Sequence, residues 1–260
     1  MTNNTTTNPT TRAIGLLTDP DRDVRFRAAT ILGSTPDPAA AEALVERLGA
    51  ESDLNVRETL TWAVVQNIGT ALPRVLELLQ SPEPAVRSQA AHVLSKVGDP
   101  AVAGHLGAVI ADDDPEVAVK AYRAAAATGR PEVVDTLVAR LSDGDTEQRD
   151  ALSTALARLG EAAVPALTSA LADPAADVRE HAADALGHLG HPDADGSAEA
   201  LGRLLADADE DVRLAAVSAL GQLGGQVAAD ALTAATASDD QRVAGVARQL
   251  LAGPRPGAED

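Results

Sequence analysis

Apolar and polar positions follow a helical period along the chain, and one stretch recurs from end to end. In its best copy, DVREHAADALGHLG, Asp177 is a typical helix N-cap residue and Gly190 is a typical helix end. Ala182, Ala185 and Leu189 fall at spacings of three and four, which places them on one helical face. Near-copies begin about every 31 residues, at Asp23, Asn55, Ala85, Glu116, Glu147, Asp177 and Asp211, with a degenerate eighth near Arg242.

A second apolar segment with helical spacing separates each copy from the next. Examples are AAVPALTSAL at 162–171 and SAEALGRLLA at 197–206. Each unit is therefore a pair of helices, and such a pair must stack on its neighbours to bury its apolar face. No alternating run of β-branched residues competes with this pattern. The sequence predicts an all-α fold, an α-solenoid of about eight helix pairs.

The repeats also set the domain boundaries. They predict one elongated solenoid over residues 11–252. Residues 1–10, MTNNTTTNPT, are rich in Thr and Asn, and residues 253–260 read GPRPGAED. Both segments are expected to be disordered, because they lack the apolar residues of a packed core.

The most regular repeats share the pattern L-x-D-P…DVR-x-x-A-x-x-A-L-G-x-L-G, at Leu171 to Gly190 and at Leu205 to Gly224. This pattern resembles HEAT repeats of the phycobilisome-lyase-like type over residues 11–252. The resemblance implies a right-handed, armadillo-like solenoid of HEAT-like pairs, in which the second helix of each pair lines a concave surface. Scaffolds and enzymes share this repeat, so the resemblance is specific for the fold and weak for activity.

Charge and composition narrow the setting of the protein. Acidic residues outnumber basic ones by 39 to 21, the net charge is −18, and Lys96 and Lys120 are the only lysines. Such an excess, with Arg in place of Lys, is typical of salt-adapted proteins, and we interpret it as the mark of a halophilic archaeon. There is no cysteine, and no membrane span or signal peptide is recognisable. A cytoplasmic location without a membrane partner is expected.

Arginine and acidic residues recur in register with the repeat. The arginines at the third position of each copy are Arg25, Arg57, Arg87, Arg149, Arg179 and Arg213. The acids four residues before the first position are Asp19, Glu51, Asp112, Asp143, Asp173 and Asp207. We expect each carboxylate to cap a turn and to accept hydrogen bonds from the guanidinium of its own or the next repeat. Ser81 and Ala118 interrupt the two series.

Histidines cluster in one region, where His181, His188 and His191 surround Asp184. Spacings of three and four place Asp184 beside His181 and His188 on one helix, as in some metal sites. The two histidines are nevertheless about 10.5 Å apart along a helix, too far to share one ion. We therefore expect an exposed polar face and no metal or cofactor.

Enzymes that share the repeat offer a further test. Deoxyhypusine hydroxylase resembles this architecture and holds iron through His-Glu pairs. None of the five histidines here is followed by a glutamate; they are His92, His105, His181, His188 and His191. The bilin lyases give no catalytic residue that can be matched, and DNA glycosylases of this fold need a basic, aromatic-lined surface. The chain is expected neither to be an enzyme nor to bind nucleic acid. The alternative is a lyase-like enzyme or an accessory of such an enzyme.

The outward positions of the repeated helix carry the remaining candidate site. Positions 4, 5, 8 and 12 face outward if the apolar positions face the core. In repeats three to five these positions hold Gln89, His92, Lys96, Lys120, Arg123 and Arg158, and Trp62 of repeat two extends the row. Asp150 is the one acid among them. We predict a protein-protein interaction scaffold that binds another protein, through an acidic segment, on its concave face; a solvated face without function is the alternative.

Overall fold

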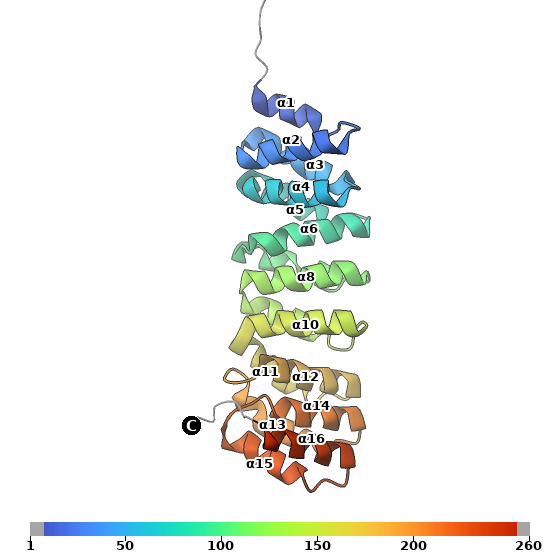
Figure 1. The fold of residues 1–260 in the computed structure, drawn as a ribbon, viewed down its shortest axis with the longest axis vertical. Helices are drawn as coiled ribbons and strands as arrows, with labels where there is room; N and C mark the ends of the chain where they lie inside the picture. Colours follow the sequence, from blue (N-terminus) through green and yellow to red (C-terminus); the bar gives the residue numbers. More distant parts are fainter. Residues whose placement is uncertain (1–7, 254–260) are drawn as a thin grey trace, which may run out of the picture. The chain divides into compact units, whose positions relative to one another are not determined.

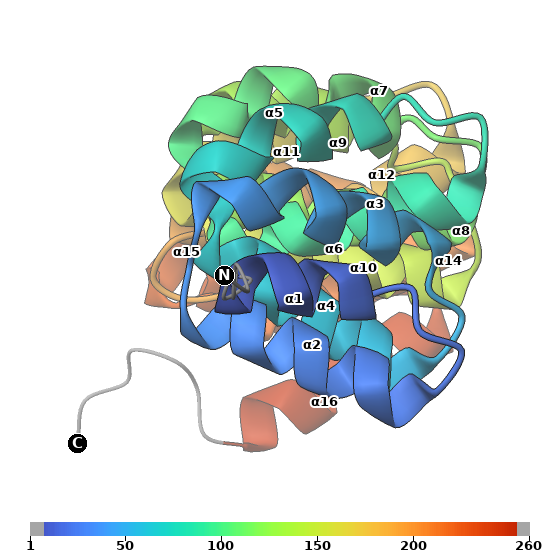
Figure 2. The same cartoon turned by 90° about the horizontal axis from the view of Figure 1, so that it is seen from above.

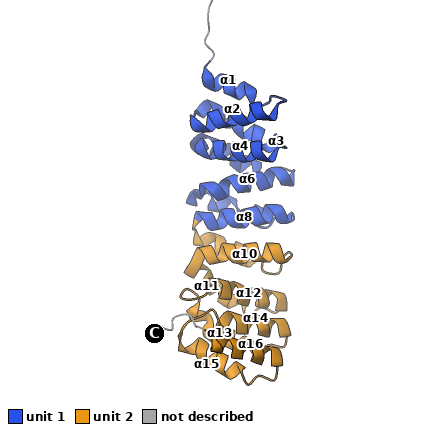
Figure 3. Cartoon of the chain, in the orientation of Figure 1, with its two compact units in different colours: residues 1–128 blue, residues 129–260 orange. Residues whose placement is uncertain are grey.

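The computed structural model describes residues 8–253, which form helices joined by short turns and contain no strand (Figure 1). The predicted all-α architecture of stacked helix pairs is confirmed. The chain divides into two compact units, unit 1 at residues 1–128 and unit 2 at residues 129–260 (Figure 3). Disorder is expected for residues 1–10 and 253–260; of these, residues 1–7 and 254–260 lie outside the described residues, whereas Pro9 and Thr10 already belong to the first helix.

Both units contain long helices alternating with shorter helical segments. Unit 1 contains α1 (Pro9–Leu16), α2 (Arg22–Ser34), η1 (Pro38–Ala40), α3 (Ala41–Ala50), α4 (Leu54–Gln66), α5 (Ile68–Leu78), α6 (Pro84–Val97), η2 (Pro100–His105), α7 (Gly107–Ile110) and α8 (Pro115–Thr128). Unit 2 contains η3 (Pro131–Val133), α9 (Val134–Val138), α10 (Thr146–Leu159), η4 (Gly160–Ala163), α11 (Val164–Ala170), α12 (Ala176–Leu189), η5 (Asp195–Ser197), α13 (Ala198–Leu204), α14 (Glu210–Leu220), α15 (Gly225–Ala235) and α16 (Gln241–Ala252).

Within each unit the helices form two layers. In unit 1, α2, α4, α6 and α8 pack side by side, and we call them the repeated-helix layer. Figure 2 shows α3, α5 and α7 as a second layer beside them. In unit 2, α10, α12, α14 and α16 form the repeated-helix layer, and α11, α13 and α15 pack against it. Within each unit, helices therefore pack both against the other layer and against their neighbours in the same layer.

The core follows the repeat as the sequence pattern predicts. The sixth position is buried in every copy, at Ala28, Leu60, Ala90, Ala121, Leu152, Ala182 and Ala216. The tenth position is also buried throughout, at Leu32, Val64, Leu94, Ala125, Leu156, Leu186 and Leu220. Alanine at most sixth positions lets neighbouring helices approach closely, so the core needs few large side chains.

The starts of the repeated helices differ from the prediction. Asp177 is not an N-cap: α12 has Ala175 at its N-cap, and Asp177 lies in the first turn. The cap stands two residues before the first repeat position, as Asp53 shows by accepting from the N–H groups of Asn55 and Val56 at the start of α4. A carboxylate in the first turn still favours the helix, because it faces the positive end of the helix dipole.

The recurring arginines and acids form a ladder between successive repeats. Arg179 donates to both carboxylate oxygens of Asp207, from Nε at 2.9 Å and from Nη2 at 2.8 Å. Its Nη1 donates to the backbone carbonyls of Asp173 and Pro174 in the turn before its own helix. Asp207 also accepts from the N–H of Asp209. One side chain therefore joins the turn of its own repeat to the turn of the next.

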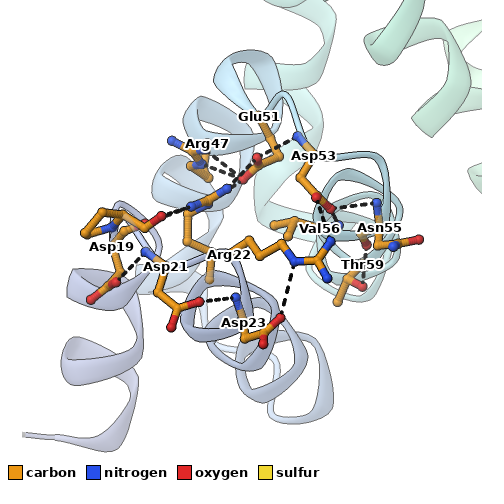
Figure 4. Close-up of polar contacts among 12 residues, drawn as sticks. Asp19, Asp21, Arg22, Asp23, Arg47, Glu51, Asp53, Asn55, Val56 and Thr59 are labelled. Carbon is orange, nitrogen blue, oxygen red and sulfur yellow. Dashed lines mark hydrogen bonds and ion pairs between the residues drawn. The ribbon is translucent and has the colours of Figure 1, made fainter.

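Two further arginines make the same bidentate contact with a carboxylate, Arg25 with Glu51 and Arg87 with Asp112. At the first of these, Arg47 of α3 also donates to Glu51, and Figure 4 shows Arg47 beside the Glu51 carboxylate. The Glu51 side chain is completely buried, with 0% of its surface exposed. This ion pair is the most enclosed of the ladder.

Two rungs depart from the prediction. Arg57 makes no ion pair within residues 8–253, because Ser81 stands where the next repeat would supply an acid. Arg149 contacts Glu180 of α12 at 3.4 Å rather than Asp173. The ladder thus depends on the acid of the following turn, as well as on the arginine.

We expect Arg179→Ala to lower the free energy of unfolding by about 1 to 3 kcal/mol, because it removes charge-assisted hydrogen bonds from a half-buried pair. Urea unfolding measures the change.

Repeat four has Ala118 in place of the arginine, so its helix at residues 116–129 is expected to exchange amide hydrogens faster than residues 177–190. Equal protection of the two helices would count against a stabilising ladder.

Candidate protein-binding surface

The predicted site residues lie on repeated helices. The six residues in unit 1 are Trp62 on α4, Gln89, His92 and Lys96 on α6, and Lys120 and Arg123 on α8. Since α4 packs on α6 and α6 packs on α8, the structure brings these six onto neighbouring helices, and we call them the α4–α8 surface. Arg158 lies on α10 in unit 2, where it is exposed.

Three cations of the α4–α8 surface have no acidic partner. Lys96 and Arg123 are exposed and Lys120 is half-buried, and none of them makes an ion pair within the described part of the chain. Elsewhere on unit 1, Arg74 pairs with Glu77, whereas the exposed Arg12 and Arg27 likewise make no ion pair within residues 8–253. In a chain with an excess of carboxylates, unpaired neighbouring cations leave a local positive potential.

His92 lies within this positive potential. Burial lowers its pKa, and the ammonium groups of Lys120 and Lys96 lower it further, whereas the carboxylate of Glu58 opposes the shift. Its Nε2 is 3.6 Å from Glu58 Oε1 and makes no hydrogen bond among the described residues. His92 is therefore mostly neutral at pH 7 and does not add to the neighbouring positive charge.

Trp62 is held in place although much of it is exposed. The side chain is 41% exposed, and its six-membered ring lies against α2 at Gly33. A Cβ atom on Gly33 would come within 2.2 Å of Trp62 Cζ3, so only glycine fits beneath the ring. Gln89 donates from Nε2 to Thr61 Oγ1, which joins α6 to the same side of α4.

Phe26 is not among the site residues predicted from the sequence; it lies on α2, the helix that packs against α4, which carries Trp62. Phe26 is 43% exposed on α2, at the edge of an open depression of about 430 Å³ that α4 completes with Val56 and Thr59. Figure 4 shows Arg22 reaching across this depression toward Asp53, to which its Nη1 donates at 3.3 Å. The signal was available, because Phe26 occupies the outward fourth position of its repeat.

The histidines do not form the exposed polar face that the sequence predicts. His181 is 1% exposed, with Nδ1 2.8 Å from Leu141 O and Nε2 3.0 Å from Ser153 Oγ. The expectation was wrong because α10 and the turn after α9 cover the outward side of α12 at this point. His188 is exposed, and His191 pairs with a carboxylate of its own loop.

Within residues 8–253, no group of three or more His, Asp or Glu side chains is placed to hold a metal ion. None of the helices in that range is both long enough and apolar enough to span a membrane.

Comparison with known proteins identifies the repeat. The family of HEAT repeats matches residues 6–65, 65–118, 105–183 and 164–252. No curated protein sequence matches the chain significantly. The matched segments extend over nearly all of the described residues.

Solved structures with a similar fold come from several classes of protein. Kap121p bound to Pho4p has a TM-score of 0.61 at 16% identity, over 93% of this chain and 32% of that chain. Human deoxyhypusine hydroxylase in complex with glycerol has a TM-score of 0.42 at 24% identity, over 94% of both chains. The complex of CpcE and CpcF of phycocyanin lyase from a Nostoc species has a TM-score of 0.45 at 22% identity, over 92% of this chain and 93% of that chain. The likeness to Kap121p concerns the fold, and the chain spans about a third of Kap121p.

Proposed function

Because the chain belongs to the HEAT repeat family, we propose that it is a scaffold whose α4–α8 surface binds a partner protein. The partner is proposed to present an acidic segment to Lys96, Lys120 and Arg123. The observation that carries the proposal is that these three cations lie on packed helices and make no ion pair within residues 8–253, in a chain of net charge −18. Kap121p, a HEAT-like stack in fold, is described in complexes with Nup53p and Pho4p, which supports protein binding by such a stack.

Charge gives this surface its selectivity. The excess of carboxylates elsewhere on the chain repels an acidic partner. The range of this repulsion is about 10 Å at 0.1 M salt and falls to about 3 Å at 1 M salt. Contacts between a carboxylate and a nearby cation survive better, because they act at shorter range. A salt-adapted, cytoplasmic setting is part of the proposal, so binding is best measured at high salt.

We expect the triple variant K96E/K120E/R123E to fold normally and to lose its partner. Lys96 and Arg123 are exposed, where a charge contributes about 0 to 1 kcal/mol, and the half-buried Lys120 makes no ion pair within residues 8–253, so circular dichroism should change little. Affinity capture at high salt from the source organism, followed by mass spectrometry, should show partners of the wild type that the variant lacks.

A control with the same charge change is R12E/R74E/R203E, whose positions lie on α1, α5 and α13 outside the repeated-helix layers. All three of these arginines are exposed. The control should retain the partners. Retention of the same partners by K96E/K120E/R123E would exclude the α4–α8 surface as the binding site.

A further inference from the structure

We propose that Phe26 and Trp62 form an anchor site for one apolar side chain of the partner's acidic segment. The anchor site consists of Phe26, Gly33, Thr59 and Trp62 on α2 and α4. The inference rests on the proposed function and adds to it a second recognition element, placed at a defined end of the α4–α8 surface. The segment is expected to carry a leucine-like residue at one end and its acids at the other.

The exposure of the two rings is the first argument. The chain has a single Phe, a single Trp and a single Tyr, and Tyr122 is completely buried. Phe26 and Trp62 instead remain 43% and 41% exposed, on helices that pack against each other. Exposed aromatic surface contributes nothing to the core, whereas aromatic residues are enriched where proteins bind one another.

The second argument is that the rings are already positioned. Trp62 rests on Gly33, where no side chain larger than hydrogen fits. Along α2, Phe26 precedes Gly33 by seven residues, which corresponds to about 10.5 Å on the same helical face. Thr59 lines the depression beside Phe26 and stands three residues before Trp62 on one face of α4. Phe26 thus lines the depression and Trp62 stands one helical turn beyond its residue Thr59, and the proposed side chain lies between the two rings.

Charge sets the direction of the segment. Asp23, Asp53 and Glu58 line the depression beside Phe26, and Arg22 is engaged there by Asp53 and Asp23. An acidic residue is therefore disfavoured at the anchor site and favoured over α6 and α8. Two interhelical spacings separate α4 from α8, about 16 to 20 Å. An extended chain covers this distance in about five or six residues.

Synthetic peptides test this arrangement directly. The probe is a fluorescein-labelled peptide with one leucine, a Gly/Ser spacer of about five residues and three consecutive acids, titrated in fluorescence anisotropy at high salt. Two control peptides replace the leucine with serine or the acids with their amides. We expect the serine peptide to bind about tenfold more weakly, and the amide peptide to lose binding.

Variants of the chain test whether the affinity contributed by the leucine arises at the anchor site. F26A and W62A should each weaken the leucine peptide about tenfold and leave the serine peptide unchanged. G33A keeps both rings but displaces Trp62, and it should act like W62A, while alanine favours the helix at that position. Since Phe26 and Trp62 are exposed, circular dichroism should show folded variants.

The outcomes separate the two proposals. Equal binding of the leucine and serine peptides, or equal weakening of both by W62A, would overturn the anchor site alone. If K96E/K120E/R123E binds the serine peptide as well as the wild type does, the acidic segment of the proposed function fails instead. If none of the peptides binds, the anchor site is refuted, and capture from the source organism still tests the scaffold.

Discussion

Glu51→Gln is expected to lower the free energy of unfolding by about 3 to 5 kcal/mol, the typical cost of breaking a buried ion pair. Arg25 donates to Glu51 from Nε at 2.8 Å and from Nη2 at 2.9 Å, and Arg47 donates from Nη2 at 2.7 Å. The N–H of Asp53 supplies a further donor at 2.9 Å. An amide in place of the carboxylate would turn its NH2 toward these donors and leave two guanidinium groups without a charge partner.

Two milder substitutions calibrate this result by urea unfolding. Asp207, whose side chain is 10% exposed, pairs with Arg179, and Asp207→Asn should cost about 1 to 3 kcal/mol. Glu199 is 79% exposed beside Arg203, and Glu199→Gln should cost less than about 1 kcal/mol. Equal costs for all three substitutions would show that burial does not determine the strength of these pairs.

Acid should weaken the wild type through the same carboxylate. Burial alone would raise the pKa of Glu51, but the hydrogen bonds from Arg25, the Asp53 amide and Arg47 outweigh it and lower the pKa to about 2. Because the folded pKa lies below the unfolded one, this contribution is complete above about pH 4.5 and is lost as the pH falls toward 2. The difference between wild type and Glu51→Gln should therefore shrink over that range. A constant difference would contradict the assignment.

The fold was predictable because the repeat states one pattern many times. Local errors in a single copy are averaged out when the sixth and tenth positions of every copy are apolar. The ladder was predictable for the same reason, since arginine and acid recur in register. The exceptions at Arg57 and Arg149 depend on which residue of the neighbouring repeat lies opposite each arginine. The pattern within one helix does not contain this information.

The burial of His181 shows where the pattern fails. A helical wheel separates the core side from the outward side of one helix, and His181 falls on the outward side. In the structure, that side faces Ser153 of α10 and the turn at Leu141. Contacts made by a neighbouring repeat thus decide burial at the edges of the apolar stripe.

The candidate surface was predictable in its composition but not in its detail. Outward positions identified Lys96, Lys120 and Arg123, but their lack of acidic partners became evident only when the neighbouring helices were in place. The support of Trp62 by Gly33 joins two repeats and leaves no trace in spacing. Close fits of this kind depend on packing, which the period of a sequence does not specify.

His181→Ala is expected to lower the free energy of unfolding by about 2 to 4 kcal/mol, from a cavity and an unsatisfied carbonyl. Nδ1 donates to Leu141 O at 2.8 Å, because a carbonyl oxygen only accepts, and Nε2 lies 3.0 Å from Ser153 Oγ and 3.2 Å from Arg149 O. His188→Ala on the same helix is the control. His188 is exposed, and its replacement should cost less than about 0.5 kcal/mol in urea unfolding.

The cost of His181→Ala should depend on pH. Burial lowers the pKa of His181, although the hydrogen bond to Leu141 opposes the shift, so the folded pKa lies below the unfolded value of about 6.5. The folded state then binds fewer protons, and the stability is complete above about pH 6.5 and declines below it. Asp184 acts in the opposite sense, because partial desolvation and then the carboxylate of Glu180 raise its pKa, but it is present in both proteins. The stability difference between wild type and His181→Ala should therefore be largest near pH 7.5 and smaller at pH 5. A difference that stays constant or grows toward pH 5 would mean that His181 is not held neutral between α10 and α12.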